Sequence, residues 1–292
     1  MTDQLTPPAP PTPPVAPGGA TGPVPPPAGS GGSAKVVAIL TATLGGAIAL
    51  GLVGSAVITT VVSASTGTAT SAVTAAGVRE LDIDVSAGSL RLEFADVSQA
   101  SLDVTGGWGS GGWTLEREGD ELIVSSPDWT FGGSWLFGGD VRAVLTLPRA
   151  LETTVLDAQF TISAGELDAS GRFGELGIDM GAGSARVSGE ARDVTAGISA
   201  GRADLDLSGV DSADLRVSAG RFEARLTGDQ PSLVDLEVSA GSLDLTLPEG
   251  SYDVTSSAEA GQVDNRLETS ASSPNRVAVQ LSAGSVSLRS AD

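Results

Sequence analysis

Hydrophobic and polar residues alternate with a period of two through most of the chain after residue 79, which is the pattern of β-strands. A recurring V-S-A-G-S corner interrupts this alternation, and the phase is shifted by one residue after each glycine. From Gly165 onward the corner glycines are about 20 residues apart, a spacing typical of repeat architectures. The pattern predicts an all-β fold in which two strands meet at each glycine.

The repeat predicts a stack of similar coils. Glycine allows a backbone conformation at the bend that other residues resist, and we expect the preceding alanine to lie inside the bend, where nothing larger fits. Coils stacked at ~4.8 Å would bury one continuous apolar column, so we predict a β-solenoid, similar to a parallel β-helix, over residues 79–292. The structural corner residues are Ala87, Gly88, Ala164, Gly165, Ala182, Gly183, Ala200, Gly201, Ala219, Gly220, Ala240, Gly241, Ala283 and Gly284, and a degenerate corner surrounds Gly261.

The N-terminal part of the chain differs from the repeats in composition. Residues 1–34 are rich in proline and glycine and nearly uncharged, so we expect a disordered cytoplasmic tail, with a PxxP ligand as the alternative. Residues 35–62 contain a long uncharged apolar run, and since about 20 such residues cross a bilayer, we predict a transmembrane helix there. Residues 63–78 are small and polar, and we expect a linker.

The predicted helix is expected to be an uncleaved signal anchor, because its apolar run exceeds the usual h-region; a cleaved signal peptide is the alternative. Lys35 precedes the run and Arg79 is the first charge after it. The positive-inside bias therefore places the tail in the cytoplasm and residues 79–292 outside the cell membrane. One helix face has a row of small residues that would permit a homo-oligomer through close helix pairing, or that arises by chance. The row is Ala47, Gly51 and Ser55.

Residues 106–140 depart from the repeat and hold all four tryptophans. Gly119-Asp120 separates two alternating segments within this insert, which predicts a β-hairpin. We expect the insert to cover the open first coil, or to contact the membrane interface or cell-wall sugars through exposed rings. Trp113 lies on an alternating strand and is expected to be buried. The candidate interaction loop comprises Trp108, Trp129, Phe131, Trp135 and Phe137, of which Trp135 and Phe137 are expected to be partly exposed.

Charge and composition disfavour several functions. All charged residues except Asp3 and Lys35 follow residue 64, so the net charge of −20 belongs to the repeat region and would repel nucleic acid. The same charge is expected to attract cationic peptides or divalent ions in a salt-sensitive manner. The chain has no histidine, no cysteine and no nucleotide-binding or hydrolase motif. We therefore expect no enzyme activity, no cofactor and no metal site.

Acidic residues recur three positions after the corner glycine, where they would line one outer face. They are Asp168, Asp204, Glu223, Asp244 and Asp264. A carboxylate pair for glycoside cleavage and a calcium ladder are the functional interpretations. Arg186 interrupts this row, and Arg225 follows Asp206 in a second row. We therefore favour ion pairs between successive coils, which would set the register.

The segment VRAVLTLPRALETTVLDAQFTISAGELDASGRFGELGIDMGAGSARVSG, residues 141–189, combines a strand ending in Leu-Pro with repeated glycine corners. In these features the chain resembles a bacterial family known as putative adhesins of unknown function, over roughly residues 79–292. The resemblance implies a β-solenoid on a membrane-anchored or exported protein, and it implies no catalytic residue. The tryptophan-rich insert is not part of this family pattern.

Two functions fit these predictions. The first is a surface-exposed, non-enzymatic interaction module whose rigid acidic faces bind a protein, a cell-wall glycan or a cationic peptide. The second is a cell-envelope stress or regulatory accessory, in which the tail and the membrane helix couple the outer domain to membrane partners. The two functions differ in whether residues 1–55 do more than anchor the chain.

Overall fold

The computed structural model describes residues 68–106, 112–127 and 141–291, all of which belong to one compact unit. This unit is all-β, as predicted, with one short 3₁₀ helix, η3 (Arg149–Leu151). The predicted tail and membrane helix lie outside the described residues, and within those residues no helix is long and apolar enough to cross a membrane.

The strands are β1 (Thr68–Val73), β2 (Glu80–Ala95), β3 (Ala100–Thr105), β4 (Thr114–Glu118), β5 (Glu121–Ser125), β6 (Arg142–Pro148), β7 (Leu156–Ser208), β8 (Ser212–Thr227), β9 (Leu233–Leu247), β10 (Ser251–Asn265), β11 (Glu268–Thr269) and β12 (Arg276–Ser290).

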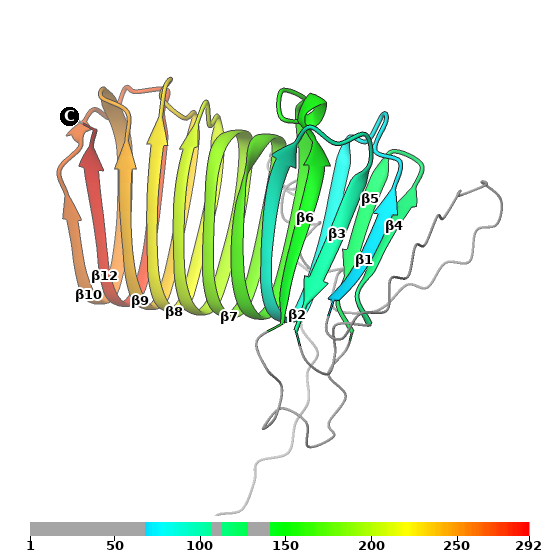
Figure 1. Cartoon of the computed structure of the whole chain (residues 1–292). Helices are drawn as coiled ribbons and strands as arrows, with labels where there is room; N and C mark the ends of the chain where they lie inside the picture. The colour runs from blue at the N-terminus through cyan, green and yellow to red at the C-terminus, as the bar shows by residue number, and fades with distance from the viewer. Residues whose placement is uncertain (1–67, 107–111, 128–140, 292) are drawn as a thin grey trace, which may run out of the picture. The chain divides into compact units, whose positions relative to one another are not determined.

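The repeats form a stack of bent coils joined by parallel strand pairing (Figure 1). Each coil has a first arm before the corner glycine and a second arm after it. Strand β2 pairs with β7, β7 with β8, and β8 with β9, and the corner glycines of paired coils are in register. Strand β7 is long because it continues through several corners without interruption. The period-two alternation with its shift at glycine therefore did predict the bend between two strands of one coil.

The coils do not follow one another in sequence order at the C-terminal end. Strand β12 lies between β9 and β10, so Gly284 pairs with Gly241 on one side and with Gly261 on the other. Strand β10 therefore forms the outermost coil, and β12, the last strand of the chain, lies between β10 and β9. The repeat pattern gives no sign of this order, because corners of the same type can stack in either sequence.

The outermost position of β10 explains why its corner is degenerate. Residues 255–262 of β10 are exposed, whereas the matching inward positions of β12 are buried apolar side chains. Ser256, for example, pairs with the buried Val279. Beyond Ser251 and Tyr252, which pair with β11, no described strand pairs with the outer edge of β10. A polar residue is tolerated at an inward position there because no further coil covers it.

The N-terminal end of the stack is covered by a cap of five further strands and η3. Strands β5 and β6 pair in parallel with the first and second arms of β2, so together they occupy the place of one more coil. Strand β4 pairs antiparallel with β5 across Gly119-Asp120, which confirms the predicted hairpin. Strand β3 pairs antiparallel with β6, and β1 with β3. The prediction of a linker over residues 63–78 is therefore wrong from Thr68 onward, since β1 belongs to the cap.

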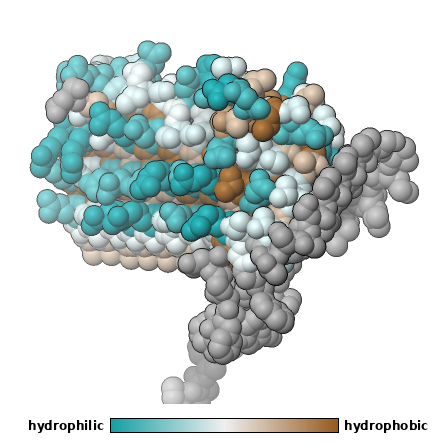
Figure 2. Space-filling model, viewed as in Figure 1, coloured by the Kyte–Doolittle hydropathy of each residue, from teal (hydrophilic) through white to brown (hydrophobic). Residues whose placement is uncertain are grey.

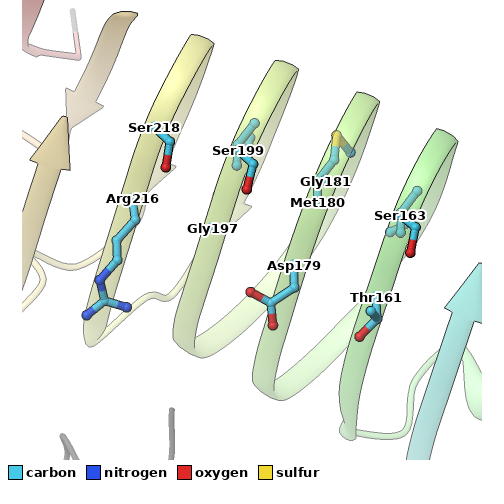
Figure 3. A pocket seen from close by; sticks show the side chains of 11 residues that line it. Thr161, Ser163, Asp179, Met180, Gly181, Gly197, Ser199, Arg216 and Ser218 are labelled. Carbon is cyan, nitrogen blue, oxygen red and sulfur yellow. The ribbon is translucent and has the colours of Figure 1, made fainter. Parts of the chain in front are cut away.

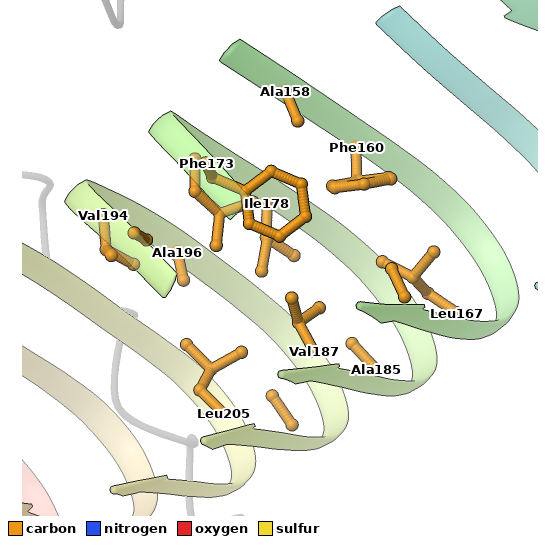
Figure 4. Close-up of a cluster of buried hydrophobic side chains, with 14 of the residues drawn as sticks. Ala158, Phe160, Leu167, Phe173, Ile178, Ala185, Val187, Val194, Ala196 and Leu205 are labelled. Atoms are coloured by element: carbon orange, nitrogen blue, oxygen red, sulfur yellow. The ribbon is translucent and has the colours of Figure 1, made fainter. Parts of the chain in front are cut away.

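The core is the apolar column enclosed by the two arms and the return turn of each coil. Inward residues of successive coils pack on one another, as Leu167, Ala185 and Val187 do in Figure 4. Phe173, from a return turn, lies edge-on to Phe160 with ring centroids 6.3 Å apart, an arrangement that aromatic pairs favour. The column continues into the cap, where Trp113 is 7% exposed, as expected.

Candidate functional site

The corner glycines form a continuous ladder along one edge of the stack. Every corner glycine has a positive φ between 115° and 154°. A Cβ at Gly220 would lie 2.2 Å from the carbonyl oxygen of Gly201, and similar contacts occur from Gly165 through Gly284. Glycine is therefore required for two reasons, the backbone conformation and the close approach of the neighbouring coil.

The corner alanines lie on the outside of the bend, which corrects the prediction that they pack inside it. Ala164, Ala182, Ala200, Ala219 and Ala240 are exposed. The reason is that four residues, from the serine to the residue after glycine, lie outside the core at each corner. The corners together form an exposed ridge of small residues, which is the white to pale-brown lower edge in Figure 2.

The tryptophan-rich segment joins the stack at this corner edge. The Ser126 amide donates to the Asp84 carbonyl at 2.9 Å, and the Ser89 amide donates to the Val141 carbonyl at 2.9 Å. The cap strands β5 and β6 thus lie beside β2 on either side of its corner. The candidate loop residues themselves lie outside the described residues, and they are Trp108, Trp129, Phe131, Trp135 and Phe137.

Three residues of the acidic row pair with arginines of other coils, in line with the structural interpretation, whereas Glu223 and Asp264 pair with arginines of their own coils. Arg91 pairs with Asp168 at 3.0 Å, and Arg186 pairs with Asp204 at 3.8 Å. Asp244 pairs with Arg289 of β12 at 3.3 Å. The last two pairs border a shallow groove of about 560 Å³. Within the described residues no group of three acidic side chains is arranged to hold a metal ion.

A second groove, of about 420 Å³, lies on the first arms of four coils in β7 and β8. We call it the glycine groove, because Gly177 and Gly197 occupy outward strand positions beside it where neighbouring coils carry polar side chains. Neither glycine has a positive φ, so the backbone conformation does not require glycine there. Glycine inside a strand weakens the strand and often marks a place where a ligand or another backbone comes close.

The two glycines allow one carboxylate to extend along the groove. A Cβ at Gly177 would collide with the side chain of Gln159, which lies across that position and donates from Nε2 to Asp179 Oδ2 at 3.2 Å. The other oxygen, Asp179 Oδ1, lies 3.2 Å from the place of a Cβ at Gly197. Oδ1 has no hydrogen-bond partner among the described residues, so the carboxylate is held from one side and open on the other.

Arg216 borders the groove on the coil beyond Gly197 (Figure 3). Its guanidinium is already engaged by two acids, through Nη2 to Asp214 at 2.5 Å and through Nε to Glu237 at 3.5 Å. The pKa of Asp214 is raised, mainly because the carboxyl is partly buried and further because Asp235 lies nearby. The guanidinium of Arg216 lowers this pKa but does not outweigh burial. With Arg216 balanced by these acids, the carboxylate of Asp179 leaves the groove with an excess of negative charge.

Hydroxyl groups form a second row in the glycine groove. Ser163, Ser199 and Ser218 come from the same position of three coils and are exposed (Figure 3). Their hydroxyls have no hydrogen-bond partner within the described part of the chain. Each can both donate and accept a hydrogen bond, so the row suits a ligand that carries hydroxyl groups. The sequence signal for this site is a polar alternation broken by glycine at outward positions, which is separate from the corner pattern.

The chain matches no protein-family model and no curated protein. Similar solved structures include a putative cell adhesion protein from Clostridium sporogenes, at 15% identity and a TM-score of 0.40, covering 77% of this chain and 99% of that one. Another is a putative adhesin from Bacteroides fragilis, at 11% identity and a TM-score of 0.41, covering 77% and 98%. The chain is similar to bacterial proteins described as putative adhesins.

The bacterial family that the chain resembles in its glycine corners is also described as putative adhesins. A third similar structure is a putative lipid binding protein from Parabacteroides distasonis, at 11% identity and a TM-score of 0.37, covering 77% of this chain and 97% of that one. These similarities assign no site residue and no ligand to this chain.

Proposed function

We propose that this protein is a single-pass membrane-anchored, surface-exposed interaction module that acts without catalysis. The observation that carries the proposal is the stack of registered coils, which presents polar outward positions on the outer faces of the first and second arms. Such faces hold side chains at fixed spacings of ~4.8 Å, as a binding surface for a repetitive or extended partner requires. The net charge of −20 favours partners that carry positive charge.

The start of β1 limits the distance between the predicted membrane helix and the cap. If residues 36–62 span the membrane, only residues 63–67 separate the membrane helix from Thr68, the first residue of β1. Five residues reach at most ~18 Å when fully extended. The cap, and with it the attachment points of the tryptophan-rich segment, would then lie close to the bilayer surface, where tryptophan is favoured. This supports a role for Trp135 and Phe137 at the membrane interface or on nearby cell-wall sugars.

Two experiments test the proposal, one on topology and one on binding. Protease added to intact cells should remove a C-terminal tag and leave an N-terminal tag. Vesicles that carry the full-length protein should bind envelope fragments from the same bacterium. A protected C-terminal tag contradicts the surface location, and a vesicle preparation that retains no more than protein-free vesicles contradicts the interaction role.

A regulatory accessory of the cell envelope is the second candidate, and the proline-rich composition of residues 1–34 favours it. Such a tail can bind cytoplasmic partners in an extended conformation. Replacing residues 1–55 by an unrelated anchor separates the two functions. The interaction module keeps its binding of envelope fragments after the exchange, whereas the accessory loses its effect on the cell.

A further inference from the structure

We infer that the glycine groove binds an amino-sugar chain, with an ammonium group of the sugar on Asp179 and sugar hydroxyls on the serine row. This inference rests on the proposed function as a surface interaction module, and it names the ligand class and the site. The groove combines three features that are independent of one another: space made by glycines, an oriented carboxylate and a row of free hydroxyls.

The space in the groove is not explained by the needs of the fold. Gly197 lies in extended backbone, and a Cβ there would meet only the end of the Asp179 side chain, at 3.2 Å. The same row carries Thr161 and Arg216 on other coils, so side chains of different sizes fit the sheet at this position. Glycine at this position makes the strand less stable than alanine would, because its backbone loses more conformational freedom on folding. The consequence of glycine at position 197 is an open path between Asp179 and the next coil.

The carboxylate in this space selects a cation. Gln159 fixes one oxygen of Asp179 and leaves Oδ1 directed over Gly197. An ammonium group placed there would form a charge-assisted hydrogen bond with Oδ1. Arg216 does not compensate this charge, because it is bound to Asp214 and Glu237.

The remaining surface favours a sugar over a peptide. A peptide that adds to a sheet needs an unpaired strand edge, but the strands under the groove are paired on both sides. The groove is shallow and presents hydroxyls from Thr161, Ser163, Ser199 and Ser218. The apolar residues that also line it, Ile162, Met180 and Ile198, are buried in the core and form no pocket for a peptide side chain. An extended chain of β-1,4-linked pyranose rings advances by about one coil spacing of ~4.8 Å per ring, so each ring can meet one coil, with every second ring turned the same way.

The test uses the purified full-length protein in mild detergent and two hexasaccharides that differ only in charge. One is the glucosamine hexamer, with free ammonium groups, and the other is its N-acetylated form. We expect the glucosamine hexamer to bind at least tenfold more tightly. Asp179→Asn should weaken its binding about tenfold, as expected for loss of one charge-assisted hydrogen bond. Gly197→Thr should abolish binding by filling the groove and should leave the melting temperature equal or higher.

A matched control separates the groove from general charge attraction. Asp206→Asn makes the same change of net charge at an exposed residue of a second arm, beyond the corner, and should change binding less than twofold. Equal losses for the two asparagine variants, equal binding of both hexamers, or no binding of either would each overturn the inference. So would a trilysine peptide that binds more tightly than glucosamine and is displaced by the same variants. Any of these results leaves the proposed function standing if vesicles still retain envelope fragments.

Discussion

At the scale of single residues, two neighbours in the corner have opposite roles. Gly220 is fixed by its backbone, with a φ of 130° and the oxygen of Gly201 in the place of a Cβ. Ala219, one position earlier, is exposed on the ridge. The sequence shows the same regularity for both, because alanine and glycine occur together in all eight corners. Recurrence alone therefore does not distinguish a residue required by packing from one that only lies on the surface.

Substitutions at these two positions should differ sharply in stability. Gly220→Ala should cost about 2–4 kcal/mol, because backbone strain and collision with the neighbouring coil both act. Ala219→Leu should change stability by less than about 0.5 kcal/mol, as is usual for an exposed position. Urea unfolding of both variants measures the difference. A loss for Ala219→Leu as large as that for Gly220→Ala would mean that the alanine packs inside the bend after all.

At the scale of elements, the cap shows where the repeat pattern stops predicting. The hairpin of β4 and β5 could be predicted because Gly119-Asp120 has a local turn signature. The role of β1 could not, because its sequence of small residues resembles a linker and its strand forms only through pairing with β3. The glycine groove could not be predicted for a related reason, since the importance of its glycines depends on side chains from neighbouring coils.

Like charges gather where the cap strand β5 pairs with β2, and this makes the stability depend on pH. Burial raises the pKa of Asp82, and burial followed by repulsion from Glu80, Asp82, Glu118 and Asp120 raises the pKa of Glu121. A carboxyl with a higher pKa in the folded chain binds its proton more readily when folded. Its contribution to stability therefore falls as the pH rises from the ordinary values of 3.8 and 4.5 through the raised ones, and the penalty is complete at neutral pH.

Glu121→Gln should accordingly raise the melting temperature at pH ~7 and have little effect near pH ~4, where the native carboxyl is protonated. Asp193 provides a control of opposite sign. Burial alone would raise its pKa, but hydrogen bonds from Arg192 at 2.8 Å and Ser212 at 2.6 Å outweigh burial and lower it. Asp193→Asn should therefore lower the melting temperature at pH ~7. Thermal unfolding followed by circular dichroism at both pH values checks both variants, and equal shifts at the two pH values for Glu121→Gln would refute the electrostatic cause.

At the scale of the whole molecule, the alternation and the glycine spacing were sufficient to predict the coils but not their order. Pairing in the middle of the stack follows the sequence, as in β7, β8 and β9. At the C-terminal end the order is decided by which corner has an apolar inner face. Strand β12 has an apolar inner face, which is buried when a coil lies on each side of it. Strand β10 has Ser256 at an inward position and is therefore suited to the open end of the stack. The degenerate corner was visible in the sequence, and its meaning as the outermost coil was not.

Removal of residues 276–292 tests this arrangement. The truncated chain lacks the partner of β10 over residues 253–265, so that segment should exchange its amide hydrogens much faster, while β7 keeps its protection. Hydrogen exchange followed by mass spectrometry measures both segments. Removal of Ala291 and Asp292 alone is the control and should leave β10 protected. Unchanged protection of residues 253–265 after the larger truncation would show that β10 can occupy the place of β12.

The place of β12 also has a consequence for the order in which the chain is completed during synthesis. Residues leave the ribosome from the N-terminus, so β10 emerges before β12, at a time when the edge of β9 is still free. In the finished stack β10 pairs with β12 and not with β9. Residues 253–265 therefore have no partner until the last strand has emerged, and closure of this end depends on non-local pairing with the C-terminal residues. A chain released early would leave both β10 and the edge of β9 unpaired, and unpaired strand edges promote aggregation.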